Sequence, residues 1–174
     1  MTAGMAHPDR RAAVLTVSDR AAAGEFVDES GPALVEGLAA LGWTVEYRDL
    51  VPDVVERIEA VLIRWADRDG IPLVLTTGGT GVAPRDVTPD ATRGVADREI
   101  PGIAEALRAA GTLNTSHAML SRGTAGVRGT TLNVNLPGSP RAVVEALAVL
   151  APVLDHALNL VAGISIRPAD HRPT

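Results

Sequence analysis

The stretch LTTGGTGVAPRDVTP, residues 75–89, combines glycines, hydroxyl side chains and an aspartate directly after an apolar run. Glycine adopts positive φ angles and lets an oxyanion approach backbone N–H groups that a Cβ would screen. Gly78, Gly79 and Gly81 are therefore candidates for a phosphate cradle. Glycine-rich turns also serve as tight strand-to-helix connections, so the glycines alone leave both interpretations open.

Two expected helix starts follow expected strand ends. Thr88 precedes Pro89 and Asp90, and Ser139 precedes Pro140. A hydroxyl at the N-cap and a proline in the first turn are typical of helix N-termini. Because such termini present unpaired N–H donors and a partial positive charge, they favour anions. We expect both to face a phosphate group.

Four aspartates are candidates for chemistry around that phosphate. Asp86 lies inside the glycine-rich loop, where no capping role is evident, so we favour a functional role for it. Asp53 and Asp19 are balanced between function and helix capping, and Asp90 fits best as a first-turn helix acid. Carboxylates beside phosphates suit Mg²⁺ and phosphoryl or nucleotidyl transfer.

The remaining polar candidates are less informative. Ser121 and Arg122, in the sequence LSRG, are open between a structural and a functional role. The four histidines are scattered without the spacing of metal ligands, so we interpret them as structural or solvated.

The composition excludes several common reaction schemes. The chain has no cysteine and all 16 basic residues are arginine, which excludes thiolate, Schiff-base and Walker-lysine chemistry. A formal charge of −5 and an aromatic content of 2% disfavour nucleic acid as a partner. With no basic, apolar leader and no apolar run near the length of a membrane helix, we expect a cytoplasmic protein without a membrane segment.

Apolar periodicity predicts the elements that must position these residues. The first half is predicted as strand 12–19, helix 32–42, strand 43–51, helix 52–70 and strand 71–77. The second half is predicted as short helices 88–98 and 102–111, an irregular stretch 112–129, strand 130–136 and a long helix 139–163 with a bend at Pro152.

The alternation of strands and helices predicts one α/β domain, residues 11–166, between flexible tails at 1–10 and 167–174. Its sheet should be mostly parallel, with helices on both faces. In such sheets ligands bind beyond the carboxyl ends of the strands. Four predicted strand ends, near Asp19, Asp53, Gly78 and Gly138, should therefore open toward one edge.

Several motifs together carry a family resemblance. They are LTVSDRAAAGEFVDESGP, VPD, LTTGGTGVAPRDVTPDAT, DREIPGIAEALR, LSRGTAGVRG and NVNLPGSP, in order over residues 11–162. The chain resembles the molybdenum-cofactor biosynthesis proteins of the Mog and MoaB type, which include the G domain of gephyrin. The resemblance implies a doubly wound α/β domain that forms a homotrimer or a hexamer. It also implies molybdopterin and ATP as substrates, Mg²⁺ as cofactor, adenylylation of the terminal phosphate of molybdopterin, and other cofactor-synthesis proteins as partners.

The resemblance also assigns roles to residues. Asp53 and Asp86 would be the catalytic carboxylates, by holding Mg²⁺ or by orienting phosphates. The implied substrate-binding residues are Ser18, Asp19, Thr76, Thr77, Gly78, Gly79, Thr80, Gly81, Arg85, Ser121, Pro137, Gly138 and Ser139. Ile103 and Ala104 replace the Phe and Gly of many members, but neither is an assigned residue. Two alternatives stay open: a MoaB-type pterin carrier without catalysis, and an interaction module.

Overall fold

The computed structural model describes residues 6–164 of the chain. The predicted flexible tails fall largely outside these residues, so their flexibility stays a prediction. Within the described part, the backbone N–H of His7 donates to Asp155 Oδ1 at 3.0 Å, and Arg10 forms an ion pair with the same carboxylate at 2.6 Å. Residues 6–10 therefore contact the last helix.

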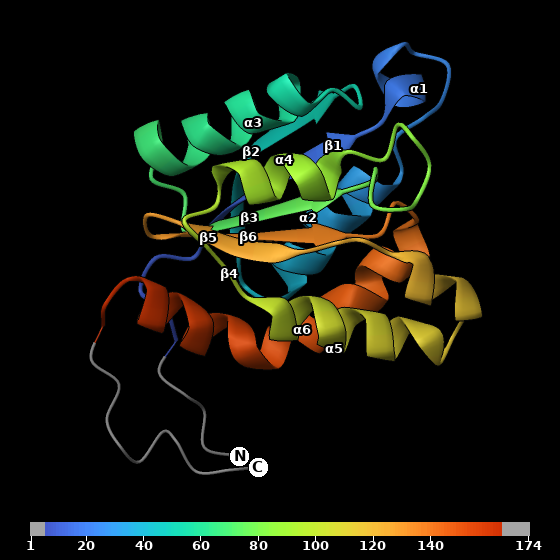
Figure 1. The fold of residues 1–174 in the computed structure, drawn as a ribbon. Coiled ribbons are helices and arrows are strands. Elements are labelled where there is room, and N and C mark those ends of the chain that lie inside the picture. Colours follow the sequence, from blue (N-terminus) through green and yellow to red (C-terminus); the bar gives the residue numbers. More distant parts are fainter. Residues whose placement is uncertain (1–5, 165–174) are drawn as a thin grey trace.

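Strands and helices alternate along most of the chain, as Figure 1 shows. The elements are β1 (Arg11–Val17), α1 (Asp19–Ala22), α2 (Ser30–Ala40), β2 (Thr44–Val51), α3 (Val55–Ile63), the π-helical turn η1 (Arg64–Arg68), β3 (Leu73–Thr77), α4 (Thr88–Val95), β4 (Arg98–Glu99), α5 (Pro101–Thr112), the 3₁₀ turn η2 (Ser116–Leu120), β5 (Ala125–Arg128), β6 (Thr131–Leu136) and α6 (Pro140–Val161).

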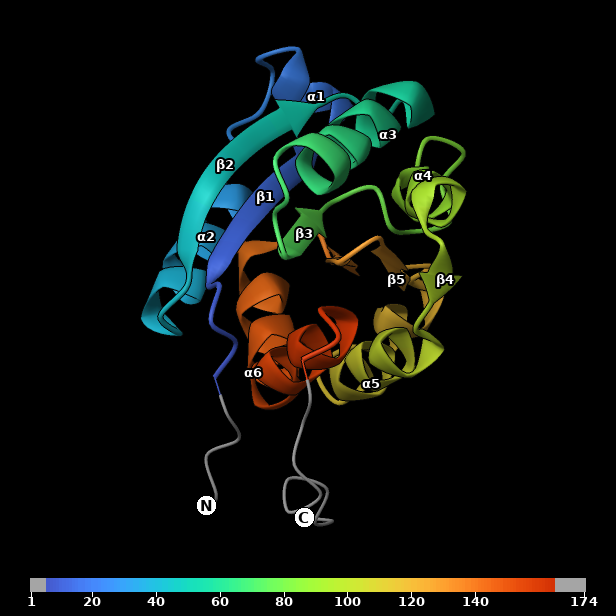
Figure 2. The ribbon, with the colours of Figure 1, turned by 90° about the vertical axis from the view of Figure 1, so that its left-hand side faces the viewer.

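The strands form one six-stranded sheet in the order β2-β1-β3-β6-β5-β4. The first four strands in that order are parallel, and β5 is antiparallel to both β6 and β4. Helices α3 and α4 cover one face, and α2, α5 and α6 cover the other (Figures 1 and 2). The predicted mostly parallel α/β sheet with helices on both faces is confirmed.

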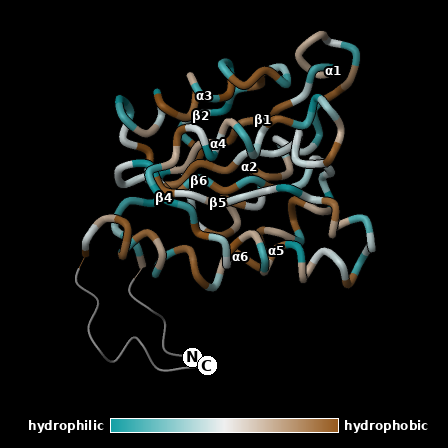
Figure 3. The backbone as a smooth tube through the Cα atoms, in the orientation of Figure 1, coloured by the Kyte–Doolittle hydropathy of each residue, from teal (hydrophilic) through white to brown (hydrophobic). Residues whose placement is uncertain are grey.

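The sheet is buried on both faces because successive residues of a strand point to opposite sides. On β1, Ala12 and Val14 pack toward α2 and α6, whereas Ala13, Leu15 and Val17 pack toward α3 and α4. Figure 3 shows hydrophobic residues along the central strands between the two helical layers. The two apolar clusters, one on each face, hold the helices against the sheet.

Several predicted boundaries were wrong. β1 ends at Val17, so Ser18 and Asp19 lie in the turn and helix that follow the strand. The stretch 112–129, predicted as irregular, contains the end of α5, η2 and β5, and β4 replaces the predicted end of a helix. β5 has only four residues, AGVR, too few to show alternation. It pairs with β6 as a hairpin, closed by a two-residue turn in which Gly129 has φ +55°.

The expectation about apolar runs also needs correction for α6. This helix has 22 residues and a mean hydropathy of 1.5 over its most apolar stretch, which is enough, by length and composition, to cross a membrane. In the structure its buried side chains, among them Val143, Leu147, Leu150 and Leu154, belong to the core against the sheet and α2. Pro152 lies inside the helix and does not end it.

Candidate functional site

A polar cavity of about 400 Å³ lies where the carboxyl ends of β1, β3 and β6 meet. The chain leaves β1 toward β2 on one side and later returns to β3 on the other, so the crevice between β1 and β3 is the switch point of the sheet. Ligands bind at such a point in open α/β sheets. The lining residues are Thr16, Val17, Ser18, Ala21, Phe26, Asp28, Glu29, Ser30, Asp53, Thr77, Gly78, Gly79, Asp86, Gly138, Ser139 and Pro140.

Eight of the predicted site residues line this cavity: Ser18, Asp53, Thr77, Gly78, Gly79, Asp86, Gly138 and Ser139. The predicted convergence of four strand ends on one edge is therefore confirmed. The other predicted residues do not line it: Asp19, Thr76, Thr80, Gly81, Arg85, Ser121 and Pro137.

The glycine turn after β3 is pressed against its neighbours. Gly78 has φ +95° and Gly79 φ +61°, conformations that side chains rarely adopt. A Cβ on Gly78 would collide with the backbone oxygen of Val17, and one on Gly79 would collide with Thr88 and, at 2.6 Å, with Asp53 Oδ1. The glycines therefore allow the turn to approach Val17, Thr88 and the Asp53 carboxylate more closely than a side chain would permit.

Loops after β3 and β6 are joined directly. Thr77 Oγ1 donates to the backbone oxygen of Pro137 at 2.7 Å, and a Cβ on Gly138 would lie 3.2 Å from Gly78 Cα. Ser139 caps α6 by accepting a hydrogen bond from the N–H of Ala142 at 3.3 Å, as predicted. The N-terminus of α6 thus stands beside the glycine turn, where its dipole favours an anion.

Thr88 does not have the predicted capping role. It is the first residue of α4, and its hydroxyl donates to the backbone oxygen of Gly78 at 2.9 Å. Its side chain is completely buried. The N-cap position is occupied by Val87, whose side chain forms no hydrogen bond, so the N-terminus of α4 has no side-chain cap.

Asp19 and Asp53 join the ends of β1 and β2. The N–H of Asp19 donates to Asp53 Oδ2 at 2.7 Å, and the N–H of Asp53 donates to Asp19 Oδ1 at 3.0 Å. Arg85 adds two hydrogen bonds to the Asp19 carboxylate, at 2.8 and 2.9 Å. The three residues connect the glycine-rich loop to both strand ends.

The pKa values of the two aspartates in this group shift in opposite directions. Burial raises the pKa of Asp53, and the neighbouring charges of Asp19 and Asp86 raise it further, although the hydrogen bond from the Asp19 N–H acts in the opposite direction. Hydrogen bonds from Arg85 lower the pKa of Asp19. Asp53 is therefore a carboxylate short of positive charge, whereas Asp19 already has a cation.

Asp86 is held at the opposite wall of the cavity. Its Oδ2 accepts a hydrogen bond from the N–H of Ala83 at 2.8 Å, and Arg122 donates to its backbone oxygen at 2.9 Å. Arg122 also pairs with Asp90 at 2.5 Å. Asp90 thus braces the loop from outside through Arg122, which fits the prediction that it is a structural helix acid.

The remaining predicted residues support the loops. Thr76 is completely buried and its Oγ1 accepts a hydrogen bond from Asn135 Nδ2 at 3.0 Å. The backbone oxygen of Thr80 accepts from the N–H of Arg122 at 2.7 Å, and Ser121 Oγ accepts from the N–H of Gly123 at 3.2 Å. Their predicted contacts with substrate stay predictions.

A family described as a probable molybdopterin binding domain matches residues 13–156. The chain belongs to this molybdopterin-binding family. The match runs from β1 into α6 and contains the cavity-lining residues, so the resemblance inferred from the motifs is confirmed.

Individual relatives agree with the family. A molybdopterin adenylyltransferase of Helicobacter pylori is 40% identical over 152 residues, which cover 86% of each chain. A molybdenum cofactor biosynthesis bifunctional protein of Chlorobaculum tepidum is 42% identical over 90% of this chain and 49% of its own length. The molybdopterin biosynthesis enzyme MoaB from Thermus thermophilus, known from a crystal structure, has 52% sequence identity to this chain. The two structures match with a TM-score of 0.84 over 90% of this chain and 99% of that one. The chain spans only 22% to 49% of the length of four longer relatives.

Sequence reasoning missed part of the lining of this molybdopterin-binding domain. Asp28 accepts hydrogen bonds from Thr16 Oγ1 at 2.8 Å, the N–H of Gly31 at 2.9 Å and Arg48 at 2.9 Å. Although burial acts in the opposite direction, these donors lower the pKa of Asp28. The available signal was an aspartate followed by Ser30 and Gly31 at the start of a helix, a pattern typical of capping.

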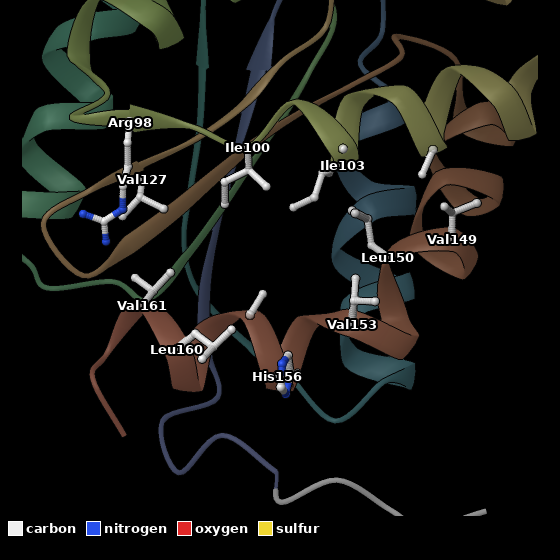
Figure 4. A pocket seen from close by; sticks show the side chains of 13 residues that line it. Arg98, Ile100, Ile103, Val127, Val149, Leu150, Val153, His156, Leu160 and Val161 are labelled. Carbon is white, nitrogen blue, oxygen red and sulfur yellow. The ribbon is translucent and has the colours of Figure 1, made fainter. Parts of the chain in front are cut away.

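A larger cavity of about 510 Å³ lies away from these residues, between α5, α6 and the β4–β5 edge. Figure 4 shows its apolar lining, including Ile100, Ile103 and Leu150, with Arg98 and His156 as its polar members. It contains no carboxylate and no glycine-rich turn. The polar cavity at the strand ends is therefore the candidate site, and the family departure at Ile103 lies outside it.

Proposed function

We propose that this chain is a molybdopterin adenylyltransferase. The observation that carries the proposal is that the Gly78–Gly79 turn and the carboxylates of Asp53 and Asp86 line one cavity at the switch point. A turn suited to binding phosphate and carboxylates suited to binding a metal would thereby act in one cavity. The adenylyltransferase of Helicobacter pylori, similar over 86% of its length, supports the same activity.

The reaction needs no covalent intermediate on the protein. An oxygen of the terminal phosphate of molybdopterin would form a bond to the α-phosphorus of ATP, while the bond from that phosphorus to the β-bridging oxygen breaks and pyrophosphate leaves. The protein must therefore align two phosphorylated substrates and offset their charge. The N–H of Gly78 donates to the backbone oxygen of Leu136, so the N–H of Gly79 and the N-terminus of α6 would bind phosphate oxygens there.

The carboxylates fit Mg²⁺ as the accompanying cofactor. Oδ1 of Asp53 and Oδ1 of Asp86 accept none of the hydrogen bonds described for residues 6–164, so each has an oxygen available. No cluster of three or more potential ligands occurs among those residues. The two carboxylates suit Mg²⁺, which is usually bound by one or two carboxylates together with substrate phosphates and waters. When bound, the ion would offset phosphate charge.

Incubation of the purified chain with molybdopterin, Mg-ATP and pyrophosphatase tests the proposal. Adenylylated pterin, detected by mass spectrometry, is the expected product. Asp67→Asn is a matched control, because Asp67 is an exposed aspartate paired with Arg128 outside the cavity. Tight pterin binding without product would reject the enzyme and support the carrier. The homotrimer or hexamer and the contacts with other cofactor-synthesis proteins remain proposals that rest on the resemblance, and the cytoplasmic location remains an expectation from the sequence.

A further inference from the structure

An exposed aromatic ring stands at the rim of the candidate site. Phe26 is the only phenylalanine of the chain, and 54% of it is exposed to solvent although it lines the polar cavity. The chain has few aromatic residues, and its two tryptophans, Trp43 and Trp65, are buried in the core. Phe26 therefore offers a flat apolar surface where phosphate-binding groups converge.

Arg20 completes this surface. Its guanidinium carbon lies 5.0 Å from the centroid of the Phe26 ring, a cation–π arrangement. Both groups are planar, and both stack on heteroaromatic rings in other proteins. Arg20 also adds positive charge at the entrance to a cavity lined by phosphate-binding backbone.

The segment that carries the two residues is fixed at both ends. On one side, α1 is capped by Ser18 and tied by Asp19 to the end of β2. On the other, Asp28 is held by Thr16 and by the N–H of Gly31. Between them, the N–H of Glu25 donates to the backbone oxygen of Arg20 at 2.9 Å. The ring is thus held at the rim without being buried.

We infer that Phe26 and Arg20 form the stacking surface for the planar heteroaromatic ring of a phosphorylated substrate. The phosphates lie deeper, at the glycine turn, and the ring rests on Phe26 at the entrance. Two rings share this chemistry, the adenine of the nucleotide and the pterin of molybdopterin. The inference rests on the proposed function for the identity of these ligands only, since stacking requires binding and not turnover.

Replacement of the ring gives a direct optical test. In Phe26→Trp, the new indole is the exposed one, because Trp43 and Trp65 are buried. The emission of these two tryptophans is measured separately with the wild-type protein and subtracted. Titrations with AMP, with molybdopterin and with inorganic pyrophosphate separate the possible sources. We expect quenching of the new emission by one of the two ring-bearing ligands and none by pyrophosphate. Equal emission changes with all three ligands, or none with either ring, overturn the inference.

Affinity measurements by calorimetry supply the second readout. Stacking of a base on an aromatic side chain changes affinity by about fivefold to 150-fold, and we expect the lower part of this range for a half-exposed ring. Phe26→Leu should weaken binding of the same ligand about five- to twentyfold and leave pyrophosphate binding unchanged. Val27→Ala is the control, because Val27 is 74% exposed on the same segment but does not line the cavity.

The outcomes separate this inference from the proposed function. Ring-dependent binding without adenylyl transfer supports the stacking surface and rejects the transferase. Adenylyl transfer with unchanged affinity in Phe26→Leu rejects the stacking surface and leaves the transferase intact. Wild-type protein that binds neither ring-bearing ligand rejects both.

Discussion

Asp19 and Asp53 each accept a hydrogen bond from the backbone N–H of the other, at 3.0 and 2.7 Å. This exchange joins the ends of two neighbouring parallel strands at the candidate site. Asp19 is neutralised by Arg85, whereas Asp53 keeps a free oxygen toward Gly79. In this pair the Asp19 carboxylate is structural, whereas the Asp53 carboxylate has one oxygen that could bind a metal ion.

Replacement of either free carboxylate should abolish most activity. Asp53→Asn and Asp86→Asn each remove a negative charge from the proposed Mg²⁺ site. Stabilisation of transition-state charge by such an ion is worth several kcal/mol. We expect turnover to fall about hundredfold or more in each variant. Adenylyl transfer under saturating Mg-ATP measures the effect. Asp67→Asn should retain wild-type turnover, and turnover near wild type in Asp53→Asn would contradict the assignment of that residue.

Arg85 should act on substrate binding more than on stability. Arg85→Lys keeps the charge but cannot form both hydrogen bonds to Asp19, because only the guanidinium has the planar fork. The loop that carries Asp86 then loses its tie to β1. We expect kcat/KM to fall by roughly tenfold, as the loss of positioning predicts. The melting temperature should change little, because Arg85 is largely exposed and Asp19 is partly exposed.

The raised pKa of Asp53 predicts a specific dependence of stability on pH. Since the folded state holds this proton more tightly than the unfolded chain, metal-free protein should lose stability as pH rises from the unfolded pKa through the folded one. Asp53→Asn should remove that part of the slope. Urea unfolding at several pH values measures it.

The like charge of Asp86 contributes to the same shift. Carboxyl NMR titration of Asp86→Asn should therefore show a lower pKa for Asp53 than in wild type. An unchanged pKa in this variant would mean that the two carboxylates do not interact across the cavity.

Alanine at Gly79 should damage both the fold and the site. Gly79 and Gly70 have the same φ of +61°, but a Cβ on Gly70 meets open space. Gly70→Ala should therefore cost only the backbone strain, about 1–2 kcal/mol. Gly79→Ala should cost roughly 1–3 kcal/mol more, because the added methyl group meets Thr88 and Asp53. Urea unfolding of the two variants measures the difference, and equal costs would argue against the close contact.

Phosphate binding gives a second comparison of these two variants. Pyrophosphate affinity, measured by calorimetry, should fall in Gly79→Ala and remain at the wild-type value in Gly70→Ala. A loss of affinity in both would point to a general effect of destabilisation and not to the glycine turn.

Local patterns were sufficient for the strands that position the site. β1, β3 and β6 are apolar runs that could be recognised as strands. Because parallel strands place their carboxyl ends along one edge of the sheet, the sequence predicted that Asp53, Gly78 and Gly138 would meet there. β5 could not be predicted in this way, because its four residues are too few to show an alternating period.

Side-chain partners were harder to predict than positions. The Thr88 hydroxyl bonds to Gly78 and not to its own helix, a choice that depends on how closely the glycine turn packs. Likewise, nothing local in the sequence indicated that Phe26 would reach the cavity. In both cases the deciding contact joins residues that are separated along the chain.

The central claim is that this cavity aligns the terminal phosphate of molybdopterin with the α-phosphorus of a nucleotide. A single-turnover reaction with ATP labelled with ³²P at either the α or the γ position tests it most directly. We expect α label to appear in the pterin product and γ label in pyrophosphate. Transfer of γ label to the pterin, or bound pterin that acquires no label from either position, would contradict it.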